Sequence, residues 1–259
     1  MLLKRWMEMK MKFLTADQVN LGFIGMGAMG RRLAQRLLDH GYEVAVYDRT
    51  RGKAEALLPY RASVGDSIAE LAANADVVLS CLTDDRAVRT VYAGPEGVFA
   101  GVREGTVVLE MSTISPEMSR ELHALGADRG VDVLDVALSG SASAVEQGTL
   151  TLLVGGGAEL FQAAVPIFST LATRYFLMGP SGSGTSMKLV VNALLGVGMQ
   201  VIAEAVALGE TAGLDRKRFL EVLAQTAVVA PAHAGKLARA EREDSLVSGI
   251  RGFGGPARI

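Results

Sequence analysis

Three groups of residues in this sequence have types and spacings that could carry chemistry, and the first is a run of glycines. Gly25-Met26-Gly27-Ala28-Met29-Gly30 has the spacing G-x-G-x-x-G, between an apolar run and an amphipathic stretch. There the first glycine permits a tight turn, the second lets the backbone approach a pyrophosphate, and the third lets a helix pack closely on a strand. The N–H groups at the start of the helix would bind the phosphates. The run therefore predicts a dinucleotide-binding turn.

The second group follows the next expected strand. Asp48 comes directly after the apolar run 43–47 and is expected to accept hydrogen bonds from the ribose hydroxyls of an adenosine. A carboxylate there repels a 2′-phosphate and favours NAD, whereas Arg49 and Thr50 beside it would favour NADP. Arg49 could instead stack on the adenine ring. These residues by themselves leave both cofactors open.

The third group is a lysine that opens the most apolar stretch of the chain. Lys188 precedes the nearly charge-free segment 189–203, and Asn192 follows one helical turn later on the same face. Partial burial and a nearby helix N-terminus both disfavour the ammonium form, so such a lysine can exchange a proton near neutral pH. The alternative is a surface lysine that keeps its amine in water.

The elements that must position these groups alternate along the chain. Short apolar runs alternate with amphipathic stretches from Asn20 to Gly179, which indicates a parallel sheet covered by helices. Helices are expected from Met29 and, with Ser115 as cap, from Pro116. After Thr185 only helical patterns follow. Strands are expected at 21–24, 43–47, 76–82, 106–111, 131–135, 150–154 and 175–178, and the later helices at 185–213 and 216–227.

The predicted fold class is α/β, a Rossmann-type doubly wound sheet followed by a smaller, incomplete all-α domain. We expect four parts. These are a disordered leader (1–19), an NAD(P)-binding domain (20–180), a helical domain (181–244) and a disordered tail (245–259).

Composition narrows the classes of protein. With 259 residues, 49% hydrophobic residues and a net charge of −2, the chain can form a large core and has no basic excess for binding nucleic acid. A single cysteine fits a cytoplasmic protein, and three histidines leave little material for a metal site, so none is expected. The segment 189–203 is too short to span a bilayer, which predicts a helix buried in protein and no membrane partner. Its several apolar faces predict a homodimer or larger homo-oligomer.

Four motifs in order resemble the β-hydroxyacid dehydrogenase family, which includes 3-hydroxyisobutyrate dehydrogenases and semialdehyde reductases. They are GFIGMGAMG at 22–30, EMST at 110–113, DVALSGS at 135–141 and GSGTSMKLVVN at 182–192. The related 6-phosphogluconate dehydrogenases would carry histidine directly before the last asparagine, where this chain has Val191. Ala137 and Ser141 stand where the family usually has proline and glycine.

The resemblance implies an NAD(P)-dependent oxidoreductase that interconverts a small β-hydroxy acid and its semialdehyde. Lys188 would be the general acid and base, and Asn192 would help to hold the substrate oxygen. The small, carboxylate-bearing substrate would contact Ser139, Gly140, Ser141 and Thr113. The cofactor would contact Gly25, Met26, Gly27, Ala28, Met29, Gly30, Asp48, Arg49, Thr50, Leu82, Thr83 and Thr113. Because Arg49-Thr50 resembles the family's NADP-type pair, we expect a slight preference for NADP over NAD.

The end of the chain departs from the family. After the segment 236–242 the family continues into further helices, one with a Lys-Asp-Leu motif, and the tail 245–259 carries neither feature. A truncated chain with weakened catalysis is therefore expected. Two alternatives remain: a catalytically impaired dinucleotide-binding protein, and an imine reductase-like enzyme, against which Lys188 counts.

Overall fold

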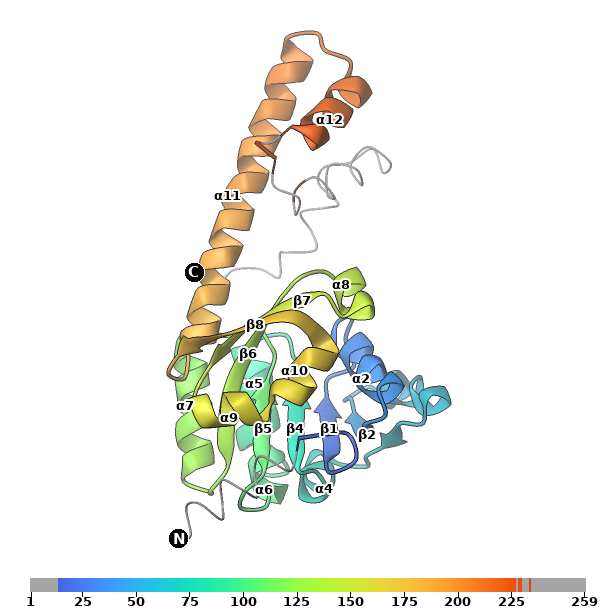
Figure 1. Cartoon of the computed structure of the whole chain (residues 1–259), viewed down its shortest axis with the longest axis vertical. Helices are drawn as coiled ribbons and strands as arrows, with labels where there is room; N and C mark the ends of the chain where they lie inside the picture. The colour runs from blue at the N-terminus through green and yellow to red at the C-terminus, as the bar shows by residue number, and fades with distance from the viewer. Residues whose placement is uncertain (1–13, 227, 230–232, 234–259) are drawn as a thin grey trace. The chain divides into compact units, whose positions relative to one another are not determined.

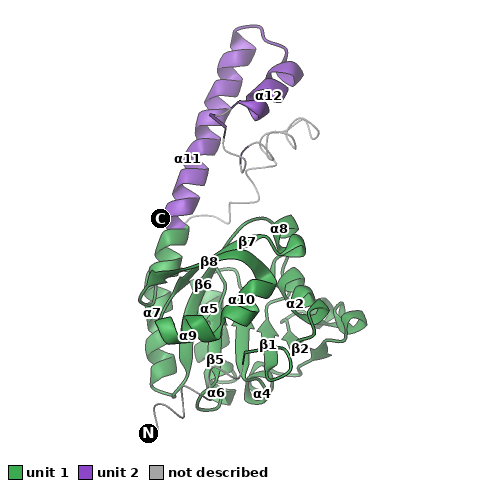
Figure 2. Cartoon of the chain, viewed as in Figure 1, with its two compact units in different colours: residues 1–188 green, residues 189–259 purple. Residues whose placement is uncertain are grey.

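The computed structural model describes residues 14–226, 228, 229 and 233. The chain forms two compact units, residues 1–188 and 189–259, which Figure 2 distinguishes by colour. This division falls inside one long helix, further along than the expected boundary at 180/181. The first turns of that helix are tied to the sheet of the first unit, as described below.

The first unit is an eight-stranded sheet with helices on both faces (Figure 1). The strand order is β3-β2-β1-β4-β5-β6-β7-β8. The strands are β1 (Asn20–Ile24), β2 (Glu43–Tyr47), β3 (Ser63–Val64), β4 (Val77–Ser80), β5 (Val107–Glu110), β6 (Asp132–Ser139), β7 (Leu150–Gly155) and β8 (Ala172–Gly179). All seven expected strands are present. The strand β3 is not among the expected strands, because its two residues are too few to form a pattern.

Two apolar cores lie on opposite faces of this sheet. One core packs α2 (Gly30–Asp39), α8 (Ala142–Gln147), α9 (Ala158–Ala163) and α10 (Val165–Leu171) against the strands. The other packs α4 (Ile68–Asn74), α5 (Asp85–Ala93), α6 (Val98–Gly101) and α7 (Pro116–Ala127). A short α3 (Arg51–Glu55) and a 3-10 helix, η1 (Leu58–Tyr60), follow β2. The doubly wound, Rossmann-type architecture is confirmed.

Local signals account for the helices that frame the site. In α2, Leu33 and Leu37 are fully buried on one stripe. In α7, Pro116 occupies the first turn and the Ser115 hydroxyl accepts a hydrogen bond from the Met118 N–H at 3.1 Å, as expected for a capped helix.

The sheet is not wholly parallel. β7 runs antiparallel to β6, whereas every other neighbouring pair is parallel. The expectation of a parallel sheet is therefore wrong at this one pair. The connection between the two strands, residues 140–149, holds only the six-residue α8, which is too short for a crossover to a parallel neighbour.

The expected leader is shorter than proposed. Leu14 and Val19 are buried in the first core, and the Tyr42 hydroxyl donates a hydrogen bond to the Leu14 carbonyl at 3.1 Å. Residues 14–19 are thus packed against the sheet, contrary to the expected disorder. Residues 1–13, the tail 245–259 and the segment 236–242 lie outside the described residues.

The second unit begins within α11 (Ser183–Thr211), which is followed by α12 (Arg216–Gln225). Ile202, Val206 and Leu220 form a small core between these two helices. By length and composition α11 could cross a membrane, and only 11% of its apolar window is buried. The expectation of a segment too short to span a bilayer is therefore wrong as to length, since α11 has 29 residues, and the described residues of this chain bury little of the helix. The apolar residues that remain exposed on α11 are Leu189, Val190, Leu194, Val197, Val201 and Leu208.

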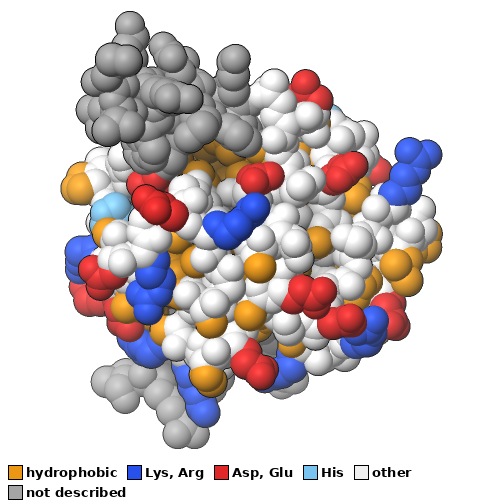
Figure 3. Space-filling model, turned by 90° about the horizontal axis from the view of Figure 1, so that it is seen from below, with side chains coloured by type: hydrophobic (Ala, Val, Ile, Leu, Met, Phe, Trp, Pro, Cys, Tyr) orange, Lys and Arg blue, Asp and Glu red, His pale blue; other side chains and the backbone are white. Residues whose placement is uncertain are grey.

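Charged side chains of both signs are interspersed on the face of the molecule shown in Figure 3, and hydrophobic side chains there are mostly single. The continuous apolar surface along α11 differs from this pattern. A surface of that kind normally marks a contact with another molecule.

We predict that this surface mediates self-association. Leu194 is 70% exposed and Val201 is 62% exposed, and they lie two turns apart on α11. The double substitution Leu194→Glu and Val201→Glu should convert a dimer or larger assembly into a monomer, because it places two charges in an apolar contact. Light scattering at micromolar concentration measures the change, with Gln200→Glu on the same helix as control. A monomeric parent protein would contradict the prediction.

Candidate active site

The glycine run forms a turn between β1 and α2 whose geometry requires two of its three glycines. Gly25 has φ +98°, and a Cβ on it would lie 2.5 Å from the Cys81 carbonyl oxygen. A Cβ on Gly30 would overlap the carbonyl oxygen of Gly25 itself. Glycine is therefore required at position 25 for the turn and at position 30 for the close packing of α2.

Gly27 has a different environment. It is exposed, and a Cβ on it would meet nothing within 4 Å. No side chain caps the N-terminus of α2, whose N-cap residue is Met29. Open space over the backbone and an uncapped helix N-terminus fit the pyrophosphate of a dinucleotide.

Asp48 braces this turn. Its carboxylate accepts a hydrogen bond from the Met26 N–H at 2.8 Å through one oxygen and from the Thr50 N–H at 2.8 Å through the other. The expected role of Asp48, binding the ribose hydroxyls, does not include this bond to the backbone of the turn. Two backbone donors already occupy both oxygens, which leaves only their remaining lone pairs for a ligand.

The residues after Asp48 present positive charge. Arg49 and Thr50 are exposed, and Arg49 has no ion-pair partner among the described residues. Arg51, in contrast, pairs with Glu55 at 2.9 Å and with Asp66 at 2.8 Å. Arg49 is thus a free cation at the carboxyl end of β2.

The loops that follow β4 and β5 are joined by a buried polar network. The Leu82 N–H donates to the Ser112 hydroxyl at 2.7 Å, and the Ser112 N–H donates to the Glu110 carboxylate at 2.7 Å. The Ser80 hydroxyl donates to the same carboxylate and is hydrogen-bonded to the Tyr92 hydroxyl at 2.7 Å. Glu110 is 1% exposed, and burial raises the pKa of its carboxyl above the ordinary value.

This network holds two loops that carry expected cofactor contacts. Leu82 lies against the Gly25 turn, while Thr83 and Thr113 are exposed beside it. The sequence motifs do not include Ser80, and they include Glu110 only as the first residue of EMST, without this supporting role. Their signal was a polar residue at the end of an otherwise apolar strand. Burial also raises the pKa of the Cys81 thiol to about 12, so this thiol is an unreactive packing group.

The expected substrate loop follows β6. Ser139 ends the strand and is half-buried, Gly140 has φ +149°, and both Gly140 and Ser141 are exposed. The Ser141 hydroxyl caps α8 by accepting a hydrogen bond from the Ala144 N–H at 3.4 Å. Because β6 is parallel to β5, this loop leaves the sheet at the same edge as Thr113.

Lys188 is the last residue of the first unit. Its side chain is half-buried, it has no hydrogen bond or ion pair with any described residue, and burial lowers the pKa of its amine. Asn192 follows one turn later in α11, and its buried Oδ1 has no hydrogen-bond partner in the described part of the chain. Both side chains therefore have free hydrogen-bonding capacity. The structure links neither of them by a hydrogen bond to the loop 139–141.

The described residues contain no group of three His, Cys, Asp or Glu side chains that could hold a metal ion. The polar groups at the carboxyl edge of the sheet are instead hydroxyls, backbone N–H groups and single charges. That donor set fits a dinucleotide and a small polar substrate.

Comparison with known proteins agrees with this geometry. Residues 20–179 match the NAD-binding domain family of 6-phosphogluconate dehydrogenase, and residues 182–245 match the NAD-binding domain family of NADP-dependent 3-hydroxyisobutyrate dehydrogenase. The NAD-dependent L-serine dehydrogenase of Pseudomonas aeruginosa is 38% identical over 78% of this chain and 68% of its own length. The 2-(hydroxymethyl)glutarate dehydrogenase of Eubacterium barkeri is 33% identical over 80% and 69%.

A solved structure has the same fold. The 3-hydroxyisobutyrate dehydrogenase of Mycobacterium tuberculosis with L-serine has a TM-score of 0.75 at 30% identity, over 83% of this chain and 72% of that one. The fold and the site thus define an NAD(P)-binding protein of the dehydrogenase class. The chain belongs to the β-hydroxyacid dehydrogenase family, among its 3-hydroxyisobutyrate dehydrogenase-like members, and the expected resemblance is confirmed.

The glycine turn gives a prediction that separates folding from cofactor binding. Gly30→Ala should lower the melting temperature of the cofactor-free protein, because the new methyl group overlaps backbone. Gly27→Ala should leave that temperature unchanged but weaken NADPH binding by about tenfold or more, since only a bound pyrophosphate would meet the methyl group.

Thermal unfolding and NADPH fluorescence titration measure the two effects. Unchanged NADPH affinity in Gly27→Ala would show that the pyrophosphate does not approach this residue.

Proposed function

We propose that this protein interconverts a small β-hydroxy acid and its semialdehyde, with Lys188 as general acid and base. One relative by sequence is a glyoxylate/succinic semialdehyde reductase of Arabidopsis thaliana, 32% identical over 84% of this chain and 75% of its own length. The observation that carries the proposal is the state of Lys188, a half-buried amine with a lowered pKa and no partner among the described residues. A proton donor with those properties is what the reaction needs.

The proton and the hydride are handled by different groups. When bound, the nicotinamide supplies or accepts the hydride. Lys188 gives a proton to the carbonyl oxygen of the semialdehyde during reduction, and removes it from the hydroxyl during oxidation. Asn192, one turn along α11, donates a hydrogen bond from its amide nitrogen to the same oxygen.

The substrate carboxylate binds at the end of β6. The Ser139 hydroxyl and the N–H of Gly140 provide two donors, and Ser141 and Thr113 add exposed hydroxyls. Donors on a short loop lose less entropy on binding a small anion than a donor at the end of a long, flexible side chain would. This loop geometry favours a small carboxylate as substrate.

The phosphates of the cofactor bind over Gly27 at the N-terminus of α2. Leu82, Thr83 and Thr113 contact its nicotinamide end, held in place by the buried Glu110 network. We also propose a cytoplasmic location, supported by the presence of a single cysteine, Cys81.

Lys188→Ala should lower kcat by about 10²- to 10⁴-fold and leave cofactor affinity unchanged, because only the proton donor is lost. The assay follows NAD⁺ and NADP⁺ reduction with two β-hydroxy acids, 3-hydroxyisobutyrate and L-serine, and NADH and NADPH oxidation with methylmalonate semialdehyde, the aldehyde of the first. Lys217→Ala, at an exposed lysine of α12, is the matched control. Reduction needs Lys188 in its protonated form, so the rate of reduction should fall as the pH rises through the lowered pKa of its amine. Oxidation needs the neutral amine, so the rate of oxidation should rise over the same pH range.

A near-normal kcat in Lys188→Ala would show that Lys188 is not the general acid and base. Cofactor binding without turnover in the parent protein would instead favour the impaired dinucleotide-binding protein.

We also predict a preference for NADPH over NADH. Arg49 is an exposed, unpaired cation among the described residues, and the Asp48 oxygens are occupied by backbone donors. Arg49→Ala should lower kcat/KM for NADPH on the order of tenfold and leave that for NADH nearly unchanged, because only NADPH carries the 2′-phosphate. Steady-state kinetics with both cofactors tests this, and a clear NADH preference in the parent would show that Asp48 dominates.

A further inference from the structure

A buried carboxylate on β6 holds the first turn of α11. Asp135 is 3% exposed and accepts hydrogen bonds from the Gly182 N–H at 2.8 Å, the Thr185 N–H at 2.9 Å and the Thr185 hydroxyl at 3.0 Å. These donors include backbone groups that a helix N-terminus leaves without internal partners. Asp135 therefore caps α11 from a different element of the fold.

Two glycines make the space that this carboxylate occupies. A Cβ on Gly155 would lie 2.5 Å from one Asp135 oxygen, and a Cβ on Gly184 would lie 2.9 Å from the other. The first glycine belongs to β7 and the second to α11. The carboxylate is thus enclosed on both sides, which fixes its orientation.

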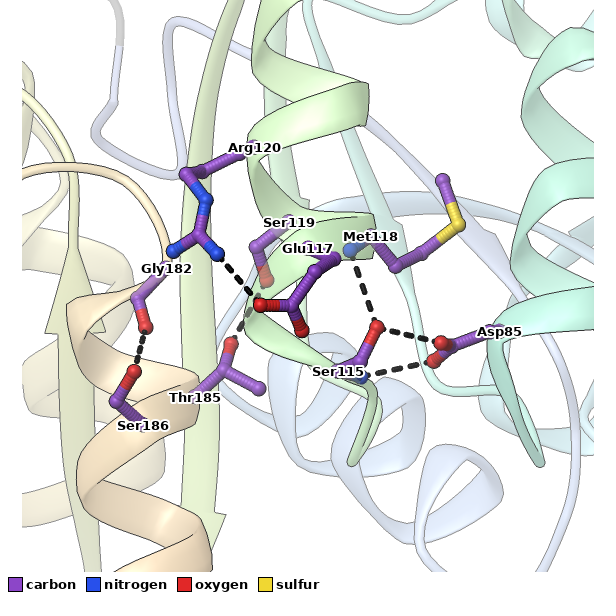
Figure 4. Close-up of polar contacts among 9 residues, drawn as sticks. All are labelled: Asp85, Ser115, Glu117, Met118, Ser119, Arg120, Gly182, Thr185 and Ser186. Atoms are coloured by element: carbon purple, nitrogen blue, oxygen red, sulfur yellow. Dashed lines mark hydrogen bonds and ion pairs between the residues drawn. The ribbon is translucent and has the colours of Figure 1, made fainter.

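The same turn is tied to α7 (Figure 4). The Ser119 hydroxyl is hydrogen-bonded to the Thr185 hydroxyl at 2.8 Å. The Ser181 hydroxyl, which the figure does not draw, donates to the Ser119 carbonyl at 3.2 Å. Because the Thr185 hydroxyl gives its single proton to Asp135, Ser119 must be the donor to Thr185. The first turn of α11 is consequently clamped between β6 and α7.

We infer that Asp135 is a positioning residue for Lys188, fixing through the clamped first turn of α11 where the lysine side chain leaves the helix. Lys188 follows Thr185 by one turn, so any shift of the capped turn moves Lys188 with it. Asp135 also lies on the strand that ends at Ser139, so one carboxylate relates the acid–base helix to the substrate loop. The inference rests on the proposed role of Lys188.

The other charges near this turn lie at the surface. From α7, Glu117 and Arg120 form an exposed pair at 2.7 Å, with Arg120 beside Gly182. From β7, the residue that faces the Asp135 carboxylate is Gly155, which has no side chain and therefore no charge. Among the described residues, Asp135 is therefore the buried charge at the start of α11.

The test measures Lys188 directly and does not require turnover. Acetic anhydride acylates neutral amines, so the acylation of Lys188 at a series of pH values, quantified by peptide mass spectrometry, gives the pKa of its amine. The variants are Asp135→Asn, which removes the charge and part of the cap, and Thr185→Val, which removes a hydroxyl without changing charge. Glu117→Gln is the control, since it neutralises an exposed carboxylate on α7.

Both variants should release Lys188 toward water. We expect its acylation midpoint to rise by about half a pH unit or more, and kcat to fall by about tenfold to 100-fold with the KM for cofactor unchanged. Unchanged midpoints and kcat in both variants would overturn the inference. A midpoint that falls in Asp135→Asn and stays unchanged in Thr185→Val would also overturn it, because the carboxylate would then act by charge.

Three further outcomes complete the test and keep this inference separate from the proposed function. If Asp135→Asn does not fold, Thr185→Val decides the question by the same measurement. If Lys188→Ala retains turnover, the proposed function fails, whatever the acylation midpoints show. If Lys188→Ala is inactive while the midpoints do not move, the positioning role alone fails.

Discussion

The parallel pairing of five neighbouring strands is the constraint on which the site depends. β2, β1, β4, β5 and β6 run in the same direction, so their carboxyl ends meet at one edge of the sheet. The glycine turn, Asp48, the loops after β4 and β5, and the loop after β6 are all continuations of these strands. Residues far apart in the sequence are thereby assembled without any long connection.

Three carboxylates then make that edge rigid, each by the same means. Asp48 accepts the Met26 N–H, Glu110 accepts the Ser112 N–H, and Asp135 accepts the Gly182 N–H. Each carboxylate comes from a strand or its end and binds the backbone of a loop or helix that is expected to touch ligand. Charge-assisted bonds of this kind fix loops whose own sequences are too short and too polar to pack.

The sequence predicted the fold well because the fold depends on local patterns. Apolar runs such as 43–47 give strands, and Ser115 with Pro116 gives a capped helix. The direction of β7 was not predictable in the same way, since it depends on the length of a connection rather than on a pattern. For the site, glycine spacing gave the turn and the requirement for Gly25 and Gly30.

The supporting residues could not be predicted, because their partners lie far away in sequence. Asp135 lies 47 residues from Gly182, and Ser80 lies 30 residues from Glu110. A buried acid within an apolar strand indicates that a hydrogen-bond donor must contact it, but not which residue supplies that donor. The low burial of α11 within this chain could not be predicted for a related reason, since an apolar helix shows in its sequence that it needs a packing partner but not which partner provides it.

The enclosure of Asp135 has a consequence for how this sequence can change over generations. A methyl group at position 155 would collide with the carboxylate, so an alanine there becomes acceptable only after position 135 has lost its acid. A methyl group at position 184 would also lie 2.4 Å from the Leu153 carbonyl oxygen, so glycine is required there with or without the acid. Loss of the acid, in turn, leaves the N–H groups of Gly182 and Thr185 without an acceptor. Positions 135 and 155 should therefore change together, whereas a lineage that has lost the acid at position 135 would be expected to keep glycine at position 184.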